Sequence, residues 1–406
     1  MIRIPTARNT RATVALLAVA GLVLAGCSST NGTGSTSSGT GSSAGSTAAA
    51  AQGTKTMDIA AGSVGDVSQF AKIADVCGST DKPLKVGVVD GYGTNTWSKT
   101  VYAEIQSEAA KCPQITSVEF VAGRGDLAAT TAGITSLAAK GVNIILVIPD
   151  AGPGEAHVSA MQAATTAGAT VVPFASDPGT AAGSAFIDYT DQAPPHSGAG
   201  WAQWVVDRLG TAGGNVVFLG GPAGAAVSAG EFTGIQQVLA KNPQIKLLTP
   251  EPVVTNWDPA QAQTAMAGLL AKFPKIDAVI TDYGATASGV IRAYEAASIT
   301  LPIMTSTDDN SLSCGFADLK AKNPGYELAT NSSRTWIGRV ALRKALAAVN
   351  AKSDHEPSIY NLNIYEDSTG SSAGSILPKA ACLPKAPADA TPSTLLSSDE
   401  IAKLFG

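Results

Sequence analysis

The chain has 406 residues, which is enough for about two domains of ordinary size. Hydrophobic residues make up 45% and charged residues 15% of it, so a large core is available although the charged share lies below the soluble average of about 25%. The formal net charge of -5 argues against a nucleic-acid-binding surface, which needs clustered Lys and Arg.

The N-terminus has the pattern of an export signal. Three arginines, Arg3, Arg8 and Arg11, precede an apolar stretch over 12–25, and Leu24-Ala25-Gly26-Cys27 follows with small residues before the thiol. The stretch is too short for a stable membrane span, so we expect residues 1–26 to be a signal peptide. The last four residues resemble the bacterial lipobox, which implies that Cys27 is lipidated and becomes the mature N-terminus. The alternative is an ordinary secretory signal with an incidental cysteine.

The next segment is predicted to be a tether. Residues 27–56 are almost all Ser, Thr, Gly and Ala, which cannot bury a core and should let a folded domain reach a partner in the same membrane. Residues 57–83 form an N-terminal extension before the first predicted strand.

Four further cysteines, Cys77, Cys112, Cys314 and Cys382, are predicted to form two disulfides, because an even count in an exported protein favours cross-links over metal ligation. Three pairings are possible. We favour Cys77 with Cys112, because these residues precede the first strand and end the helix after it, and Cys314 with Cys382 by elimination.

From Leu84 the sequence alternates between apolar strands and amphipathic helices. The first series predicts strands over 84–89, 118–121, 144–148 and 170–174, with helices over 97–111, 126–140 and 161–167. The second series predicts strands over 215–219, 245–248, 278–281 and 303–306, with helices over 196–209, 230–241, 259–272 and 285–297. Repeated βαβ units predict an α/β protein with two doubly wound parallel sheets and a crevice at the carboxyl ends of the strands.

The order and spacing of several segments resemble the type I periplasmic sugar-binding proteins, and the ribose-binding group in particular. The segments are Val86-Gly87-Val88-Val89, Asn95-Thr96-Trp97, Lys140-Gly141-Val142-Asn143-Ile144-Ile145-Leu146, Gly234-Ile235-Gln236-Gln237-Val238, Asn256-Trp257-Asp258 and Ala278-Val279-Ile280-Thr281-Asp282. The resemblance implies two lobes joined by three crossings that close over a ligand by a hinge motion. By analogy, the first lobe comprises 84–189 plus 334–352, including a helix over 336–349. The second comprises 190–333 plus 353–380, including a strand over 360–365, and 381–406 form a tail that ends in an amphipathic helix.

The resemblance also implies a function. We expect an extracytoplasmic, lipid-anchored receptor of an ABC importer, monomeric, which captures a sugar or polyol and delivers it to permease subunits. The alternatives are a receptor of the same fold that reports to a membrane sensor, and a binder of an amino acid or a nucleoside.

Binding such a ligand needs aromatic plates for its C–H faces and carboxylates or amides for its hydroxyls. Trp97 and Trp257 lie after strands where the family places stacking aromatics, although simple packing is the alternative. Polar candidates at strand ends are Asp90, Asn95, Asp282 and Asp308, for which a helix N-cap is the competing role, together with Ser176 and Asp177.

The sequence departs from the ribose-binding pattern where the family often uses arginines. No arginine lies near Ser176, and Glu231 stands near the second position, which argues against ribose itself and leaves an acidic, hydroxyl-rich or cationic-ligand site as an alternative. Arg334 is a substitute candidate from the hinge, and an interlobe salt bridge is its alternative role. Three histidines in no metal spacing and no Gly-x-Ser-x-Gly elbow leave no catalytic set. We therefore expect no enzyme activity, metal or cofactor.

Overall fold

The computed structural model describes residues 56–59 and 71–406, which belong to one compact unit, Ala49–Gly406. The predicted signal peptide, Cys27 and the tether before Thr56 lie outside the described residues. No helix among the described residues is long and apolar enough to cross a membrane.

The first sheet contains four parallel strands in the order β3 (Ile115–Ala122), β2 (Leu84–Asp90), β4 (Ile144–Ile148) and β5 (Thr170–Pro173). Successive side chains of a strand point to opposite faces, so Val88 joins one core and Val89 the other. On Val88's side pack α2 (Thr96–Ala109) and α10 (Ile337–Val349), and on the other side α3 (Leu127–Ala139) and α4 (Val158–Thr166). We call this sheet with its four helices the first lobe.

The second sheet has the order β14 (Ile364–Asp367), β12 (Leu328–Asn331), β11 (Ile303–Thr307), β10 (Ala278–Thr281), β7 (Gly214–Gly220) and β8 (Ile245–Leu247), and β9 (Val253–Val254) also pairs with β7. The edge strand β14 is antiparallel to β12, and the other pairs are parallel. One core contains α5 (Pro194–Leu209) and α6 (Ala226–Leu239); the other contains α7 (Pro259–Lys272), α8 (Gly284–Ala297) and α9 (Asn310–Lys322). We call this sheet with its five helices the second lobe.

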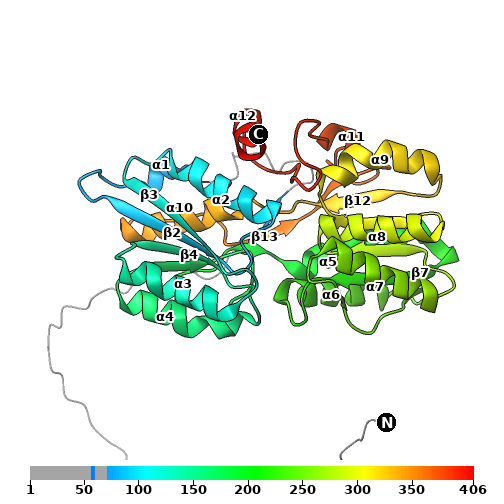
Figure 1. Cartoon of the computed structure of the whole chain (residues 1–406), viewed down its shortest axis with the longest axis horizontal. Helices are drawn as coiled ribbons and strands as arrows, with labels where there is room; N and C mark the ends of the chain where they lie inside the picture. The colour runs from blue at the N-terminus through cyan, green and yellow to red at the C-terminus, as the bar shows by residue number, and fades with distance from the viewer. Residues whose placement is uncertain (1–55, 60–70) are drawn as a thin grey trace, which may run out of the picture. The chain divides into compact units, whose positions relative to one another are not determined.

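A third, small parallel sheet links the lobes, with the order β1 (Thr56–Ile59), β13 (Ile359–Leu362) and β6 (Asp191–Gln192). Figure 1 shows β13 running between the two larger sheets. The single strand predicted over 360–365 is therefore two strands, interrupted at Asn363. At this residue the chain leaves the linking sheet and joins the edge of the second large sheet. The strand β12 was not predicted.

Both favoured disulfides are present. Cys77–Cys112 joins the end of α1 (Ile73–Val76) to the segment after α2, and Cys314–Cys382 joins α9 to the end of α11 (Pro378–Ala381). Two short 3-10 helices lie at Gly154–His157 and Gly210–Ala212.

The C-terminal tail runs from the second lobe to the first. The Asn310 amide at the start of α9 donates to the carbonyls of Leu383 and Pro387, and at the far end Glu104 of α2 accepts from the backbone of Leu395. The final helix, α12 (Ser398–Phe405), begins with a capping box of Ser397 and Glu400 and packs on α2 (Figure 1). An amphipathic helix packed on the body was predicted here.

Candidate functional site

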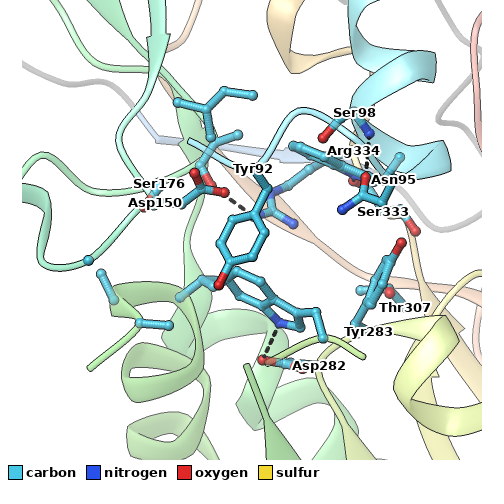
Figure 2. A pocket seen from close by; sticks show the side chains of 18 residues that line it. Tyr92, Asn95, Ser98, Asp150, Ser176, Asp282, Tyr283, Thr307, Ser333 and Arg334 are labelled. Atoms are coloured by element: carbon cyan, nitrogen blue, oxygen red, sulfur yellow. Dashed lines mark hydrogen bonds between the residues drawn. The ribbon is translucent and has the colours of Figure 1, made fainter. Parts of the chain in front are cut away.

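A pocket lies where strand ends of both lobes and the segment after β12 meet, with about 750 Å³ of empty space that includes its opening to solvent. The first lobe contributes segments after β2, β4 and β5, and the second lobe contributes segments after β7, β9 and β10 and the end of β11. Its lining residues are Tyr92, Asn95, Trp97, Ser98, Ile148, Asp150, Gly152, Ala175, Ser176, Ala225, Ala226, Val227, Trp257, Asp282, Tyr283, Thr307, Ser333 and Arg334. Figure 2 shows the ring of Tyr92 reaching across this pocket from the side of Asp150 toward Asp282.

Trp257 is held in place by backbone geometry and by a hydrogen bond. Asn256 and Trp257 have φ values of 52° and 53°, in the left-handed region, before Asp258 caps α7. The indole N–H donates to Asp282 Oδ2 over 3.2 Å. The ring lies against the bare Cα of Gly221, where a Cβ would come within 2.2 Å of it. The indole is therefore oriented by its loop without any help from a ligand.

Asp282 directly follows β10 and has one oxygen engaged and one oxygen free. Oδ2 accepts from the Gly221 N–H, the Ser228 hydroxyl and the Trp257 indole. Oδ1 is buried and has no hydrogen-bond partner in the described part of the chain. Burial raises the pKa of Asp282 to about 6. A fixed carboxylate with a free oxygen at a pocket wall is suited to accept a hydrogen bond from a ligand.

The first lobe presents aromatic side chains to the same space. Tyr92 and Trp257 meet edge to face across the lobes, with ring centroids 5.6 Å apart and planes 71° apart. The Trp97 indole N–H donates to the Ser333 carbonyl over 2.8 Å, which fixes the ring at the pocket wall. Asn95 lines the pocket and also caps α2 by accepting from the Ser98 N–H, so both of its predicted roles are compatible.

Asp150 lines the pocket beside Asp90, which is only 1% exposed. Asp90 Oδ1 accepts from the Tyr92 N–H, and its Oδ2 has no partner within the described residues. Asp150 Oδ1 is likewise unpartnered and lies against Gly91, where a Cβ would approach it to 2.1 Å. Burial raises the pKa of Asp90 to about 6, and burial together with repulsion from Asp90 raises the pKa of Asp150 well above its usual value.

Arg334 lines the pocket on the side of the linking sheet. Its Nε donates to Asp191 Oδ1 over 2.8 Å and its Nη2 donates to the Ala175 carbonyl over 3.1 Å. Asp191 belongs to β6, so this ion pair joins the crossing strand to the segment between β12 and α10. Ser176 lines the pocket next to this pair.

The structure thus places six of the predicted residues at the pocket, namely Trp97, Trp257, Asp282, Asn95, Ser176 and Arg334. Four others do not line it. Asp90 lies behind it, and Asp177 lines a second cavity beside β6 and accepts from the Gly179 N–H. Glu231 is fully buried in α6 and accepts from Gln192.

Asp308 differs most clearly from the sequence prediction, which named it as a candidate for binding the ligand. Its Oδ1 accepts from the backbone and hydroxyl of Ser333, and its Oδ2 accepts from the Ser393 N–H of the tail. Both oxygens are therefore used by the protein itself. Of the two aspartates that the sequence offers as a cap before α9, Asp308 and Asp309, it is Asp309 that caps the helix.

The sequence reasoning did not identify several lining residues, among them Tyr92, Asp150 and Tyr283. Asp150 follows β4 directly after Pro149, so the strand-end rule that selected Asp282 applies equally to it. Tyr92 carries no such signal, because its role depends on Trp257, which is distant in the sequence. Among the described residues no group of three or more His, Cys, Asp or Glu side chains is arranged to hold a metal ion.

Comparison with known proteins agrees with this geometry. A family model described as "Periplasmic binding protein domain" matches residues 86–353, more than half of the chain. The chain belongs to this family. The solute-binding protein of an ABC transporter from Mycobacterium smegmatis, solved with bound glycerol, has the same fold, with a TM-score of 0.63 and 19% identity over 76% of this chain and 99% of that chain.

Two curated relatives match by sequence over shorter segments. A xylitol-binding protein of Mycolicibacterium smegmatis is 36% identical over 27% of this chain and 31% of its own length. A D-allose-binding periplasmic protein of Escherichia coli is 32% identical over 25% of this chain and 32% of its own length. The chain therefore spans about a third of each of these relatives. These relatives are binding proteins.

Proposed function

We propose that this protein is the extracytoplasmic receptor of an ABC importer and that it captures a small polyhydroxylated ligand, a sugar or polyol, between its two lobes. The observation that carries the proposal is the pocket itself. It joins the aromatic rings of Tyr92, Trp97 and Trp257 to free carboxylate oxygens, with walls from both lobes. Aromatic faces suit the C–H surfaces of such a ligand, and carboxylates suit its hydroxyls. The relatives that bind xylitol and D-allose support the ligand class.

The mechanism that we propose is closure of the lobes over the ligand. The contact between Tyr92 of the first lobe and Trp257 of the second exists only while the lobes are together. A ligand that contacts both walls shifts the population toward this arrangement, which a permease can then recognise by its shape. The segments that link the lobes, including β6 and β13, are the natural hinge.

Thermal unfolding of the full chain with a panel of pentoses, hexoses, polyols, amino acids and nucleosides tests this proposal. A ligand present at about 100 times its Kd stabilises the folded state by roughly 2.7 kcal/mol. We expect a shift with a sugar or polyol that is lost in Trp97→Ala and in Trp257→Ala. Val254→Ala, an exposed position on β9, is the matched control and should keep the shift. A shift with an amino acid or a nucleoside alone would contradict the ligand class.

We also propose that the chain is exported and anchored through a lipid on Cys27, with the segment to Thr56 as its tether, which is supported by the pattern Leu24-Ala25-Gly26-Cys27. Cys27→Ser is expected to move the protein from the membrane fraction to the soluble fraction and to abolish labelling by a fatty-acid probe. Labelling that persists in this variant contradicts the assignment. Ligand-stimulated ATP hydrolysis by the reconstituted permease with this protein tests the transport role against a purely sensory one.

A further inference from the structure

The pocket carries more negative than positive charge. Asp90, Asp150 and Asp282 lie in or directly behind its walls, and each has an oxygen atom without a hydrogen-bond partner in the described structure. Asp90 and Asp282 are 1% and 7% exposed, so both carboxyl groups are largely withdrawn from bulk solvent. A buried carboxylate without a partner is costly.

Few positively charged groups lie at the pocket to offset these carboxylates. Arg334 is the one basic residue among those that line the pocket in the described part of the chain. Its charge is already matched by Asp191, and its remaining bond goes to a backbone carbonyl. Lys99 and Arg124, on the neighbouring segments of the first lobe, are exposed. No basic side chain is among the principal influences on the pKa of Asp90, Asp150 or Asp282.

The other titratable groups around the pocket do not offset this charge. Tyr92 faces Asp150, and burial followed by repulsion from Asp150 raises the pKa of its phenol. Glu231 faces Asp282, and burial raises its pKa well above the usual value. Tyr283 lies near Asp309 and Asp389, two further acids. The site therefore offers acceptors and negative charge to a ligand and lacks a free cation.

We infer that the ligand is a hydroxylated amine, such as an amino sugar or amino polyol, and that its ammonium group binds at Asp150, which lines the pocket with Asp90 directly behind it. This inference rests on the proposed function and narrows its ligand class. A neutral polyol fills the free oxygens but leaves the charge uncompensated, whereas an ammonium has several N–H donors and supplies the charge as well. Charge-assisted bonds of this kind are stronger than neutral ones.

Binding has a defined proton balance. In the free protein, burial raises the pKa values of Asp90 and Asp150, and repulsion from Asp90 raises that of Asp150 further, which favours a proton on this pair. A ligand that arrives as an ammonium ion displaces that proton to the buffer, and no bond is made or broken otherwise. A neutral ligand leaves the proton in place. The affinity of the amine therefore rises as pH increases from 5 to 7.5, because the carboxyls ionise while an alkyl amine, like lysine, stays protonated.

Isothermal titration of the full chain with matched pairs tests the inference. The pairs are D-glucitol with 1-amino-1-deoxy-D-glucitol, and xylitol with 1-amino-1-deoxyxylitol. In at least one pair we expect the amine to bind about 10-fold tighter or more. Titration in buffers of different ionisation enthalpy should show proton release for the amine and none for its neutral partner.

Substitutions of Asp90 and Asp150 test the position that is assigned to the ammonium group. Asp90→Asn and Asp150→Asn keep the side-chain shape and remove a buried charge, so both are expected to fold, as circular dichroism can check. Each should abolish proton release and reduce the preference for the amine to less than about 3-fold. Asp318→Asn, an exposed position on α9, changes net charge equally and should alter neither.

The outcomes separate the two proposals. Neutral members that bind as tightly as their amines, without proton release, overturn the amine inference and leave the polyol receptor intact. Binding by no member of any pair, and by no sugar of the thermal panel, overturns both. A preference for amines that survives Asp90→Asn and Asp150→Asn shows that the ammonium binds elsewhere and overturns the assigned position.

Discussion

At the scale of single residues, the position of Trp257 in the second lobe depends on an unfavourable backbone conformation that is held by contacts of its indole. Asn256 and Trp257 both have left-handed backbone, which asparagine tolerates but which costs about 1–2 kcal/mol for a residue such as tryptophan. The indole is kept there by its bond to Asp282 and by close approach to Gly221. Such strain is characteristic of functional segments, because the ring is positioned before the ligand arrives.

Gly221→Ala tests this positioning without changing any charge. The added methyl would lie 2.2 Å from the indole, so the ring must move away from Asp282 and from Tyr92. We expect ligand affinity to fall about 3- to 10-fold, the range expected for a lost aromatic contact. Gly268→Ala, with open space around its Cα, is the control and should bind normally. An unchanged Kd for Gly221→Ala would show that the position of Trp257 is irrelevant to binding.

At the scale of helices and strands, hydrophobic periodicity predicted most elements because each strand of a parallel sheet is buried on both faces. The predicted bounds of the helix Pro259–Lys272 and the strand Ala278–Thr281 match the structure. The strand β12 was missed because Leu328-Ala329-Thr330-Asn331 is short and half polar, and its Thr330 bonds to Glu366 of the neighbouring strand. The local sequence pattern does not reveal the contact between Thr330 and Glu366, because the two residues are 36 positions apart in the chain.

The site was less predictable than the fold for the same reason. Strand-end position selected both Asp282 and Asp308, which are alike in the sequence. Only the folded chain separates them: the tail and Ser333 occupy both oxygens of Asp308, whereas one oxygen of Asp282 stays free. Contacts between segments far apart in the sequence decide which acid can bind a ligand.

Glu104 is the point at which α2, α10 and the tail are joined. One oxygen accepts from Arg339 of α10, and the other accepts from the Thr394 hydroxyl and the Leu395 N–H, each over 2.6 Å. The carboxylate is completely buried. A buried charge network of this kind is strongly destabilised by loss of one member, because the partners stay buried without compensation.

Glu104→Ala is expected to lower the free energy of unfolding by about 3–5 kcal/mol, as measured by chemical denaturation. Hydrogen exchange at Leu395 should also accelerate, because its N–H loses its acceptor. Glu119→Ala provides the comparison: its ion pair with Lys140 is on the surface and contributes about 0–1 kcal/mol. Similar losses in the two variants would mean that the tail is not fastened through Glu104.

At the scale of the whole molecule, buried carboxyls dominate the response to pH. Burial raises the pKa of Asp282 and Asp90 to about 6, of Asp309 to about 7 and of Glu366 to about 8. In the unfolded chain these groups lose their protons near pH 4. Between those values the folded state binds more protons than the unfolded state, so stability falls as pH rises.

Asp367 at low pH and His157 within the same range as the buried carboxyls oppose this trend. Hydrogen bonds from Thr369 and Ser372 outweigh burial and lower the pKa of Asp367 to about 2, so its contribution is lost only below about pH 4. Burial lowers the pKa of His157, which favours the folded state as pH rises through the histidine range. One histidine opposes at least four carboxyls. The maximum of stability without ligand is therefore expected near pH 5.

Thermal unfolding of the ligand-free protein should accordingly give a Tm that is highest near pH 5 and falls toward pH 8. Glu366 is the sharpest probe, because its oxygens accept from the Ser313 and Thr330 hydroxyls and its pKa is raised to about 8. Glu366→Gln keeps an acceptor at this position and removes the charge, so the variant should gain about 2–4 kcal/mol over the parent at pH 8 and little at pH 5. A Tm that climbs steadily from pH 5 to pH 8 in both proteins would mean that these carboxyls are ionised in the folded state, and the reasoning from burial would fail.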